Sequence, residues 1–159
     1  MKNHIIPLIL ILLLSCGEEK RLYLQIDGNA TLDECIRAND FTVLCYIDSV
    51  DCTFCSMQWL DLWTFRMEDL KKLKTGIALI VRNPDEEAVR DALSRLQLQF
   101  PVAYDKSSTI KQNNPLILNH NAVFAVNRKK EVVWLGLPVK NEDTWNIFIK
   151  TLQRHSKSK

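Results

Sequence analysis

The hydrophobic and polar positions along the chain predict short buried strands separated by helices. Phe41 to Ile47 is a continuous run of apolar, β-branched and aromatic residues, which is typical of a central strand buried on both faces. Ile77 to Val81 has the same character, and Phe100 to Tyr104 predicts a third, shorter strand. Ala122 to Val126 and Glu131 to Leu135 flank a polar turn, so they predict an antiparallel hairpin.

Helices are expected between these strands. Thr31 to Glu34 matches a capping box that opens the first helix. Ser56 to Lys74 has apolar residues at helical spacing, and Gly76 is expected to end that helix. Asn83 and Asn141 are expected to cap two later helices. The alternation predicts an α/β fold in which helices cover both faces of a mixed central sheet. Residues 105–118 are expected to be loop with at most one helical turn.

The first residues are expected to be a targeting signal. Lys2 precedes the apolar stretch Ile5 to Leu14, which is too short to span a bilayer stably. Leu13-Leu14-Ser15-Cys16 resembles the bacterial lipobox, in which the cysteine becomes the lipid-modified N-terminus. We therefore expect a signal peptide at 1–15, a lipidated tether at 16–30, a domain at 31–155 and a disordered tail at 156–159. The alternative is an ordinary secretory signal with a chance cysteine.

Composition narrows the function classes. Hydrophobic residues make up 47% and charged residues 25% of the 159, as in a soluble globular domain, and the formal net charge is +2. No long basic run with interleaved aromatic residues is present, so we expect no nucleic-acid partner. None of the four glycines forms a phosphate-binding loop, and no cofactor is expected.

The chemistry is expected at Cys52-Thr53-Phe54-Cys55, which follows the strand at 41–47 after the turn Asp48 to Asp51. A cysteine pair at a helix start is typical of a thiol–disulfide redox site, because free N–H groups and the helix dipole favour the reactive thiolate. Zinc sites use the same spacing, so the motif alone leaves both interpretations open. Cys35 and Cys45 are expected to be buried, inert thiols.

This order of elements, with the cysteine pair before the second helix, resembles the thioredoxin fold and the TlpA-like, membrane-tethered thioredoxins of bacterial envelopes. The resemblance implies a protein thiol–disulfide oxidoreductase, with Cys52 as the attacking thiol and Cys55 as the resolving one. It implies protein thiols or disulfides of the cell envelope as partners, together with an unidentified upstream redox partner. Through Cys16 the protein would be lipid-anchored to a membrane and face the periplasm or the exterior.

Three positions depart from the family pattern. Asp51 stands where a neutral residue usually precedes the first cysteine, and its charge opposes the thiolate, so we expect a reductant rather than a strong oxidant. Tyr46 stands where the family often has a buried carboxylate, which leaves water or Asp48 to move protons. Asn121 or His120 stands where the family has a cis-proline, so the loop there is expected to be trans and the substrate preference altered.

Three other functions compete with this interpretation of the sequence. Cys52, Cys55 and His120 could form a three-ligand copper or zinc site, as in a metal chaperone. A binding module with a non-catalytic cysteine pair is the second. A peroxidase of the peroxiredoxin kind is disfavoured, because Ser49 has the expected spacing from Cys52 but no proline precedes it and no arginine is close in sequence.

Overall fold

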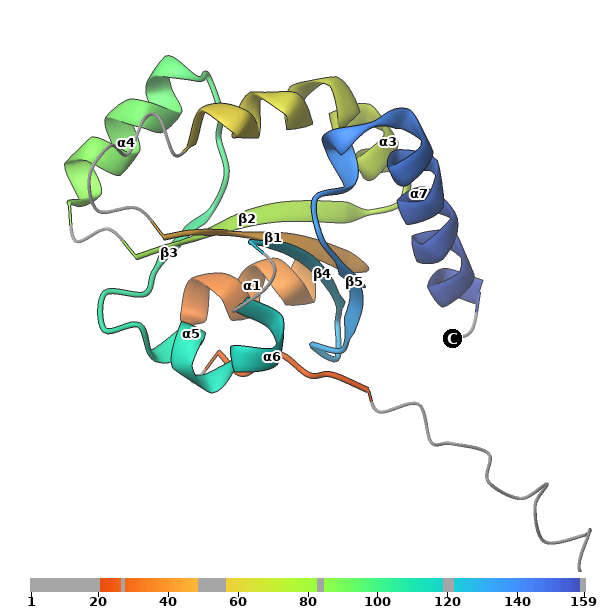
Figure 1. Ribbon diagram of the computed structural model, residues 1–159, viewed down its shortest axis with the longest axis horizontal. Helices are drawn as coiled ribbons and strands as arrows, with labels where there is room; N and C mark the ends of the chain where they lie inside the picture. Colours follow the sequence, from red (N-terminus) through yellow and green to blue (C-terminus); the bar gives the residue numbers. More distant parts are fainter. Residues whose placement is uncertain (1–20, 27, 49–56, 83–84, 119–121, 158–159) are drawn as a thin grey trace, which may run out of the picture.

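The computed structural model of the protein describes residues 21–26, 28–48, 57–82, 85–118 and 122–157. Its centre is a five-stranded mixed sheet in the order β3-β2-β1-β4-β5 (Figure 1). The strands are β1 (Phe41–Ile47), β2 (Thr75–Val81), β3 (Val102–Tyr104), β4 (Val123–Asn127) and β5 (Val132–Leu135). β1, β2 and β3 are parallel, whereas β4 is antiparallel to both β1 and β5. The predicted strands and hairpin are confirmed, with shifts of one or two residues at their ends.

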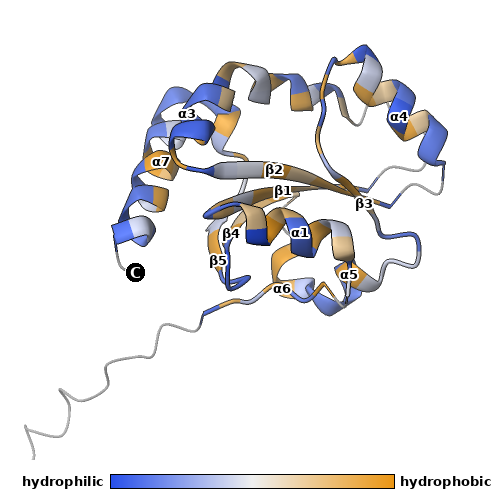
Figure 2. Ribbon diagram, turned by 180° about the vertical axis from the view of Figure 1, so that it is seen from behind, coloured by the Kyte–Doolittle hydropathy of each residue, from blue (hydrophilic) through white to orange (hydrophobic). Residues whose placement is uncertain are grey.

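Helices cover both faces of the sheet, as predicted. One face carries α4 (Glu86–Arg95), α7 (Glu142–Lys157), α3 (Met67–Lys72) and the 3₁₀ helices η1 (Gln58–Arg66) and η2 (Pro138–Lys140). The other carries α1 (Ala30–Ala38), α5 (Thr109–Asn113) and α6 (Pro115–Leu118) (Figure 1). Hydrophilic residues occupy much of α4 and α7, while β1 and β4 are largely hydrophobic (Figure 2). The fold class is therefore α/β.

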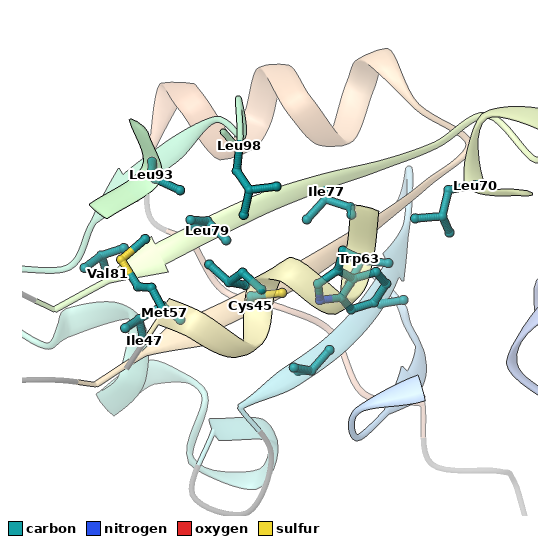
Figure 3. Packing of buried hydrophobic residues seen from close by; sticks show 14 of the residues in the cluster. Cys45, Ile47, Met57, Trp63, Leu70, Ile77, Leu79, Val81, Leu93 and Leu98 are labelled. Atoms are coloured by element: carbon teal, nitrogen blue, oxygen red, sulfur yellow. The ribbon is translucent and has the colours of Figure 1, made fainter. Parts of the chain in front are cut away.

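The sheet separates two hydrophobic cores. All seven residues of β1 are buried, because successive side chains of a strand point to opposite faces and both faces are covered. Phe41, Val43 and Cys45 belong to the core under η1 and α7, which also holds Met57, Leu60 and Trp63 (Figure 3). Leu44 and Tyr46 belong to the core under α1 and α6.

The segment after the cysteine pair is not the continuous α-helix that the sequence predicts. Met57 is helical, but Gln58–Arg66 is a 3₁₀ helix, and only Met67–Lys72 is α-helical again. Met57, Leu60 and Trp63 are fully buried at a strict spacing of three residues. A 3₁₀ helix has three residues per turn, so it places all three on one line facing the sheet, whereas an α-helix would rotate them progressively away.

Gly76 does not end a helix but lies within β2. A Cβ at this position would clash with the side-chain amide of Asn39. That amide donates a 2.7 Å hydrogen bond to the carbonyl of Cys35 and so satisfies the end of α1. The glycine is needed for this close approach, and Lys74, at φ 48°, makes the turn into the strand.

Two predicted helix caps are wrong by two residues. The first helix is capped by Asn29, whose side chain accepts from the N–H of Leu32, and not by Thr31. Asp85, not Asn83, caps α4 by accepting from the N–H of Ala88. The predicted cap at Asn141 is confirmed by its bond from the N–H of Thr144. Residues 105–118, expected to be loop with at most one helical turn, contain the two short helices α5 and α6.

The folded domain extends further than predicted at both ends. Leu24 and Ile26, placed in the tether by the sequence, are buried in the core under α1. Their segment is attached through the Leu24 N–H, which donates to Lys130 O, and through both backbone groups of Gln25, which bond Asn114. At the other end α7 continues to Lys157, into the expected tail. In the described part of the chain, no helix is both long and apolar enough to cross a membrane.

Candidate functional site

The parallel strands bring three charged residues to one edge of the sheet. Asp48 follows β1, Arg82 follows β2 and Asp105 follows β3, and the three strands are parallel and adjacent in the order β3-β2-β1. The carboxyl ends of parallel strands meet at one edge, which is the usual place for sites in open α/β sheets. We call this the carboxyl edge. It is also where β1 leads into residues 49–56, which contain the predicted cysteine pair.

Most predicted site residues lie outside the described part of the chain. This is true of Asp51, Cys52, Cys55, His120 and Asn121, and of the predicted lipidation site Cys16. Asp48 is the one member of the predicted site within the described residues.

The structure nevertheless fixes where the two site segments attach to the fold. The N–H of Tyr46, near the end of β1, donates a 2.7 Å hydrogen bond to the carbonyl of Ala122. Cys45 pairs with Val123 in the β1–β4 register. The chain that carries 119–121 therefore enters β4 directly beside the strand that leads to 49–56.

The far end of the segment 49–56 is also anchored. Met57, the first described residue after it, is completely buried. Its side chain packs near Ile47 and Val81, at the ends of β1 and β2 (Figure 3). Both attachment points of the cysteine segment are thus fixed at the carboxyl edge.

Asp48 is held between two cations. Its Oδ1 lies 2.5 Å from Nε of Arg82, and its Oδ2 lies 2.5 Å from Nζ of Lys111 on α5. The hydrogen bond from Lys111 and the charges of Lys111 and Arg82 hold the pKa of Asp48 below its ordinary value, although burial acts in the opposite direction. Asp48 is therefore an anion with both oxygens engaged. This argues against the role of proton carrier that the sequence left open for it.

A buried tyrosine–carboxylate pair lies beside this cluster. The hydroxyl of Tyr46 donates a 3.0 Å hydrogen bond to Oδ2 of Asp105, which is 3% exposed. The carboxylate also accepts from the backbone N–H groups of Ile110 and Lys111, so it fixes the start of α5. Burial, the hydrogen bond to Asp105 and the nearby negative charges raise the pKa of Tyr46, so its phenol stays protonated.

Asp105, Arg82 and Lys111 were not found by sequence reasoning. Arg82 and Asp105 could have been found from the sequence, because a charged residue directly after a buried parallel strand lies at the carboxyl edge of the sheet. Arg82 is distant from Cys52 in sequence, but it is ion-paired to Asp48, which stands four residues before Cys52. Lys111 offers no comparable signal.

Cys35 and Cys45 are free thiols on opposite sides of the sheet. Burial raises the pKa of both, and Cys45 is completely inaccessible. A buried thiol with a raised pKa is a poor nucleophile. The prediction that both are structural is supported.

The described residues contain no group of three histidine, cysteine or acidic side chains able to hold a metal ion. The alternative ligand set of Cys52, Cys55 and His120 lies outside them.

The carboxyl edge holds two cations, Arg82 and Lys111, and two carboxylates, Asp48 and Asp105. A further anion at this edge, such as a thiolate, would be stabilised by the cations and opposed by the carboxylates. The ion-paired cluster around Asp48 can therefore act on a thiolate at this edge.

The chain matches no protein-family model and no curated protein by sequence. It is similar to solved structures, among them a domain of a possible thiol-disulfide isomerase from Cytophaga hutchinsonii, with 13% identity and a TM-score of 0.55 over 76% of this chain and 80% of that one. Another is peroxidoxin BcpB from Mycobacterium tuberculosis, with 10% identity and a TM-score of 0.54 over 77% and 84% of the two chains. A third is a putative thiol:disulfide interchange protein DsbE from Chlorobium tepidum, with 12% identity and a TM-score of 0.53 over 83% and 93%. The protein has a thioredoxin-like fold, as the sequence predicted.

Proposed function

We propose that the protein is a thiol–disulfide oxidoreductase of a bacterial cell envelope that uses Cys52 and Cys55 on protein substrates, acting as a reductant. The observation that carries the proposal is the attachment of residues 49–56 at the carboxyl edge of a thioredoxin-like sheet. The two other cysteines of the domain are buried, so this pair supplies the reactive thiols. The names of the two similar proteins described as thiol–disulfide enzymes agree with this assignment.

The two thiols of the chain supply both electrons for the reduction of one substrate disulfide. The Cys52 thiolate attacks a substrate disulfide, forms a mixed disulfide and releases one substrate thiolate. The Cys55 thiolate then attacks the Cys52 sulfur, which releases the second substrate thiolate and leaves a Cys52–Cys55 disulfide. Two electrons have passed to the substrate, whose thiolates take up two protons. A dithiol protein donor of the envelope must return two electrons to the pair.

The lipobox resemblance supports attachment to a membrane through Cys16, as in TlpA-like thioredoxins. The described domain begins at Arg21, so the lipidated residue would stand five positions before it. Compartment and anchor fit the chemistry, because disulfides persist outside the cytoplasm.

Insulin reduction tests the proposal. Turbidity from released insulin B chain, with dithiothreitol as donor, should rise faster with the wild type than with donor alone. Cys52→Ser should abolish this acceleration, and Cys55→Ser should trap a mixed disulfide with insulin that mass spectrometry detects. Cys45→Ala serves as the matched control, because its thiol is buried, and it should retain full activity. An inactive wild type would overturn the proposal in favour of a binding module.

Peroxide reduction is a second candidate, favoured by the position of Arg82 at the carboxyl edge. In this reaction the Cys52 thiolate would attack a hydroperoxide, giving a sulfenate and an alcohol, and Cys55 would then form the disulfide with loss of water. Peroxide consumption by the reduced protein measures it. A rate above that of free cysteine, lost in Arg82→Gln, would support this reaction, and a rate equal to that of free cysteine would exclude it.

A further inference from the structure

The described chain begins at a defined place on the fold. Arg21 pairs with Glu131 at the start of β5, with Nε 3.4 Å from Oε1. Tyr23 forms a β-bridge with the same glutamate, and the Leu22 carbonyl accepts from the N–H of Val132. Residues 21–24 therefore lie beside the β4–β5 turn, in the region where Figure 1 shows the first coloured residues.

This place is at the opposite edge of the sheet from Asp48. The β4–β5 turn follows Asn127, which pairs with Phe41, the first residue of β1. Asp48 follows the last residue of the same seven-residue strand. At about 3.3 Å per residue the strand separates the two edges by roughly 20 Å. We call the edge at which β1 and β2 begin the amino edge.

Basic side chains gather at the amino edge. Arg128 donates from Nε to the carbonyl of Asn39, and the carbonyl of Lys74 accepts from the N–H of Asp40, so the β4–β5 turn and the end of α3 flank the start of β1. These two segments contribute Lys71, Lys72, Lys74, Arg128, Lys129 and Lys130, of which all but Lys130 are exposed.

The acidic residues of this edge do not balance the basic ones. Glu68 and Asp69 pair with Lys71 and Lys72, Asp40 pairs with Arg128, and Asp33 pairs with Lys130. Lys74 and Lys129 form no ion pair with a described residue. The amino edge therefore presents excess positive charge to solvent, and an anionic surface is its natural complement.

The length of chain before Arg21 brings a membrane to this edge. From Cys16 to Arg21 the chain makes five steps of at most about 3.6 Å each, or roughly 18 Å. Electrostatic attraction extends over a Debye length of about 8 Å at physiological ionic strength. A lipid on Cys16 would thus keep the basic residues within reach of the membrane, where they can approach anionic headgroups to within a Debye length.

We propose that the amino edge docks on an anionic phospholipid surface, so that the anchored domain presents the carboxyl edge away from the membrane. The inference rests on the anchor proposed at Cys16 but not on the thiol chemistry. In this orientation the carboxyl edge would meet proteins in the aqueous envelope rather than groups at the bilayer surface.

Lysine footprinting of the mature, lipidated chain tests this. The protein is reconstituted in vesicles of phosphatidylcholine with phosphatidylglycerol, or of phosphatidylcholine alone, and acetylated with an N-hydroxysuccinimide ester. We expect Lys74 and Lys129 to react at least about threefold more slowly on the anionic vesicles, with the difference lost in high salt. Lys106 and Lys111, beside the carboxyl edge, should react equally on both.

A pair of charge reversals provides the matched control. In the wild type, docking should also slow the neighbouring Lys71 and Lys72. Lys74→Glu with Lys129→Glu should remove that slowing, while Arg90→Glu with Lys106→Glu, at positions away from the amino edge, should leave it unchanged. Slowing at Lys106 and Lys111 instead, or equal rates on both vesicles, would overturn the proposed orientation. Flotation with the vesicles and the mass of the Cys16 peptide report on the anchor separately, and insulin reduction reports on the thiol chemistry.

Discussion

The hydroxyl of Tyr46 donates a 3.0 Å hydrogen bond to the buried carboxylate of Asp105, joining β1 to the segment that follows β3. Tyr46 is six residues before Cys52, and its backbone N–H also bonds Ala122, so one residue connects three segments at the carboxyl edge.

Tyr46→Phe should destabilise the domain. The change leaves the shape of the side chain nearly intact but removes one of the three hydrogen bonds that described residues donate to the buried carboxylate of Asp105. Hydrogen bonds to charged groups contribute about 1.5–3 kcal/mol, and we expect a loss in this range in the free energy of unfolding measured with urea. Tyr104→Phe is the control, since that hydroxyl has no hydrogen-bond partner among the described residues; it should change stability by less than about 0.5 kcal/mol.

The hydrogen bond between Tyr46 and Asp105 should also make the stability of the domain depend on pH in the alkaline range. Burial and the bond to Asp105 raise the pKa of Tyr46 above the ordinary value of 10.0. The folded state therefore holds a proton that the unfolded state releases, so this contribution is complete below pH 10 and is lost as the pH rises above it. Urea unfolding between pH 9 and 11.5 should show a shallower fall in stability for Tyr46→Phe than for the wild type. Parallel curves for the two proteins would mean that Tyr46 is not the responsible group.

The cations around Asp48 should control the reactivity of Cys52. Asp48→Asn leaves Arg82 and Lys111 without their common partner, so more of their positive charge acts on a neighbouring thiolate. We expect alkylation of Cys52 by iodoacetamide at pH 7 to become roughly twofold to fivefold faster. Lys111→Gln should slow it.

Arg90→Gln, on the outer part of α4, is the control for this experiment and should have no effect. Identical alkylation rates in all four proteins would show that the ion-paired cluster does not act on the cysteine.

Asn114 should be needed to hold the N-terminal segment. It is 3% exposed, and its side chain bonds the N–H of Gln25 at 2.8 Å and the carbonyls of Gln25 and Ile110 at 2.6 and 2.7 Å. Asn114→Ala leaves these backbone groups without their side-chain partner, which should cost about 1–3 kcal/mol in unfolding free energy. Trypsin should also cleave after Arg21 faster than in the wild type. Gln112→Ala, an exposed change on α5, should alter neither.

The strands and the fold class were predictable because a sheet covered on both faces requires unbroken apolar strands, and Phe41–Ile47 is such a run. The 3₁₀ helix was not predicted, because two apolar residues three positions apart lie on the same face of either an α-helix or a 3₁₀ helix. Only a longer series with a spacing of three, such as Met57, Leu60 and Trp63, distinguishes the two kinds of helix. Gly76 was misassigned because its role depends on Asn39, which is distant in sequence.

The candidate site was only partly predictable. The cysteine pair is visible as a local motif, but Asp105 and Lys111 join the edge through contacts 59 and 63 residues apart in the chain, which no local pattern reveals. Arg82 was overlooked for the same reason, since it is close to Asp48 only because β1 and β2 are parallel neighbours.

A redox titration of Cys52 and Cys55 in the full protein tests the central claim most directly. The protein is equilibrated with dithiothreitol mixtures of known potential, and its free thiols are alkylated and counted by mass spectrometry. We predict one transition in which both cysteines change together by two electrons, at a potential well below the roughly −120 mV of strongly oxidising thioredoxin-fold proteins. If no disulfide forms between them at any potential, the account of this protein as a thiol–disulfide oxidoreductase is contradicted.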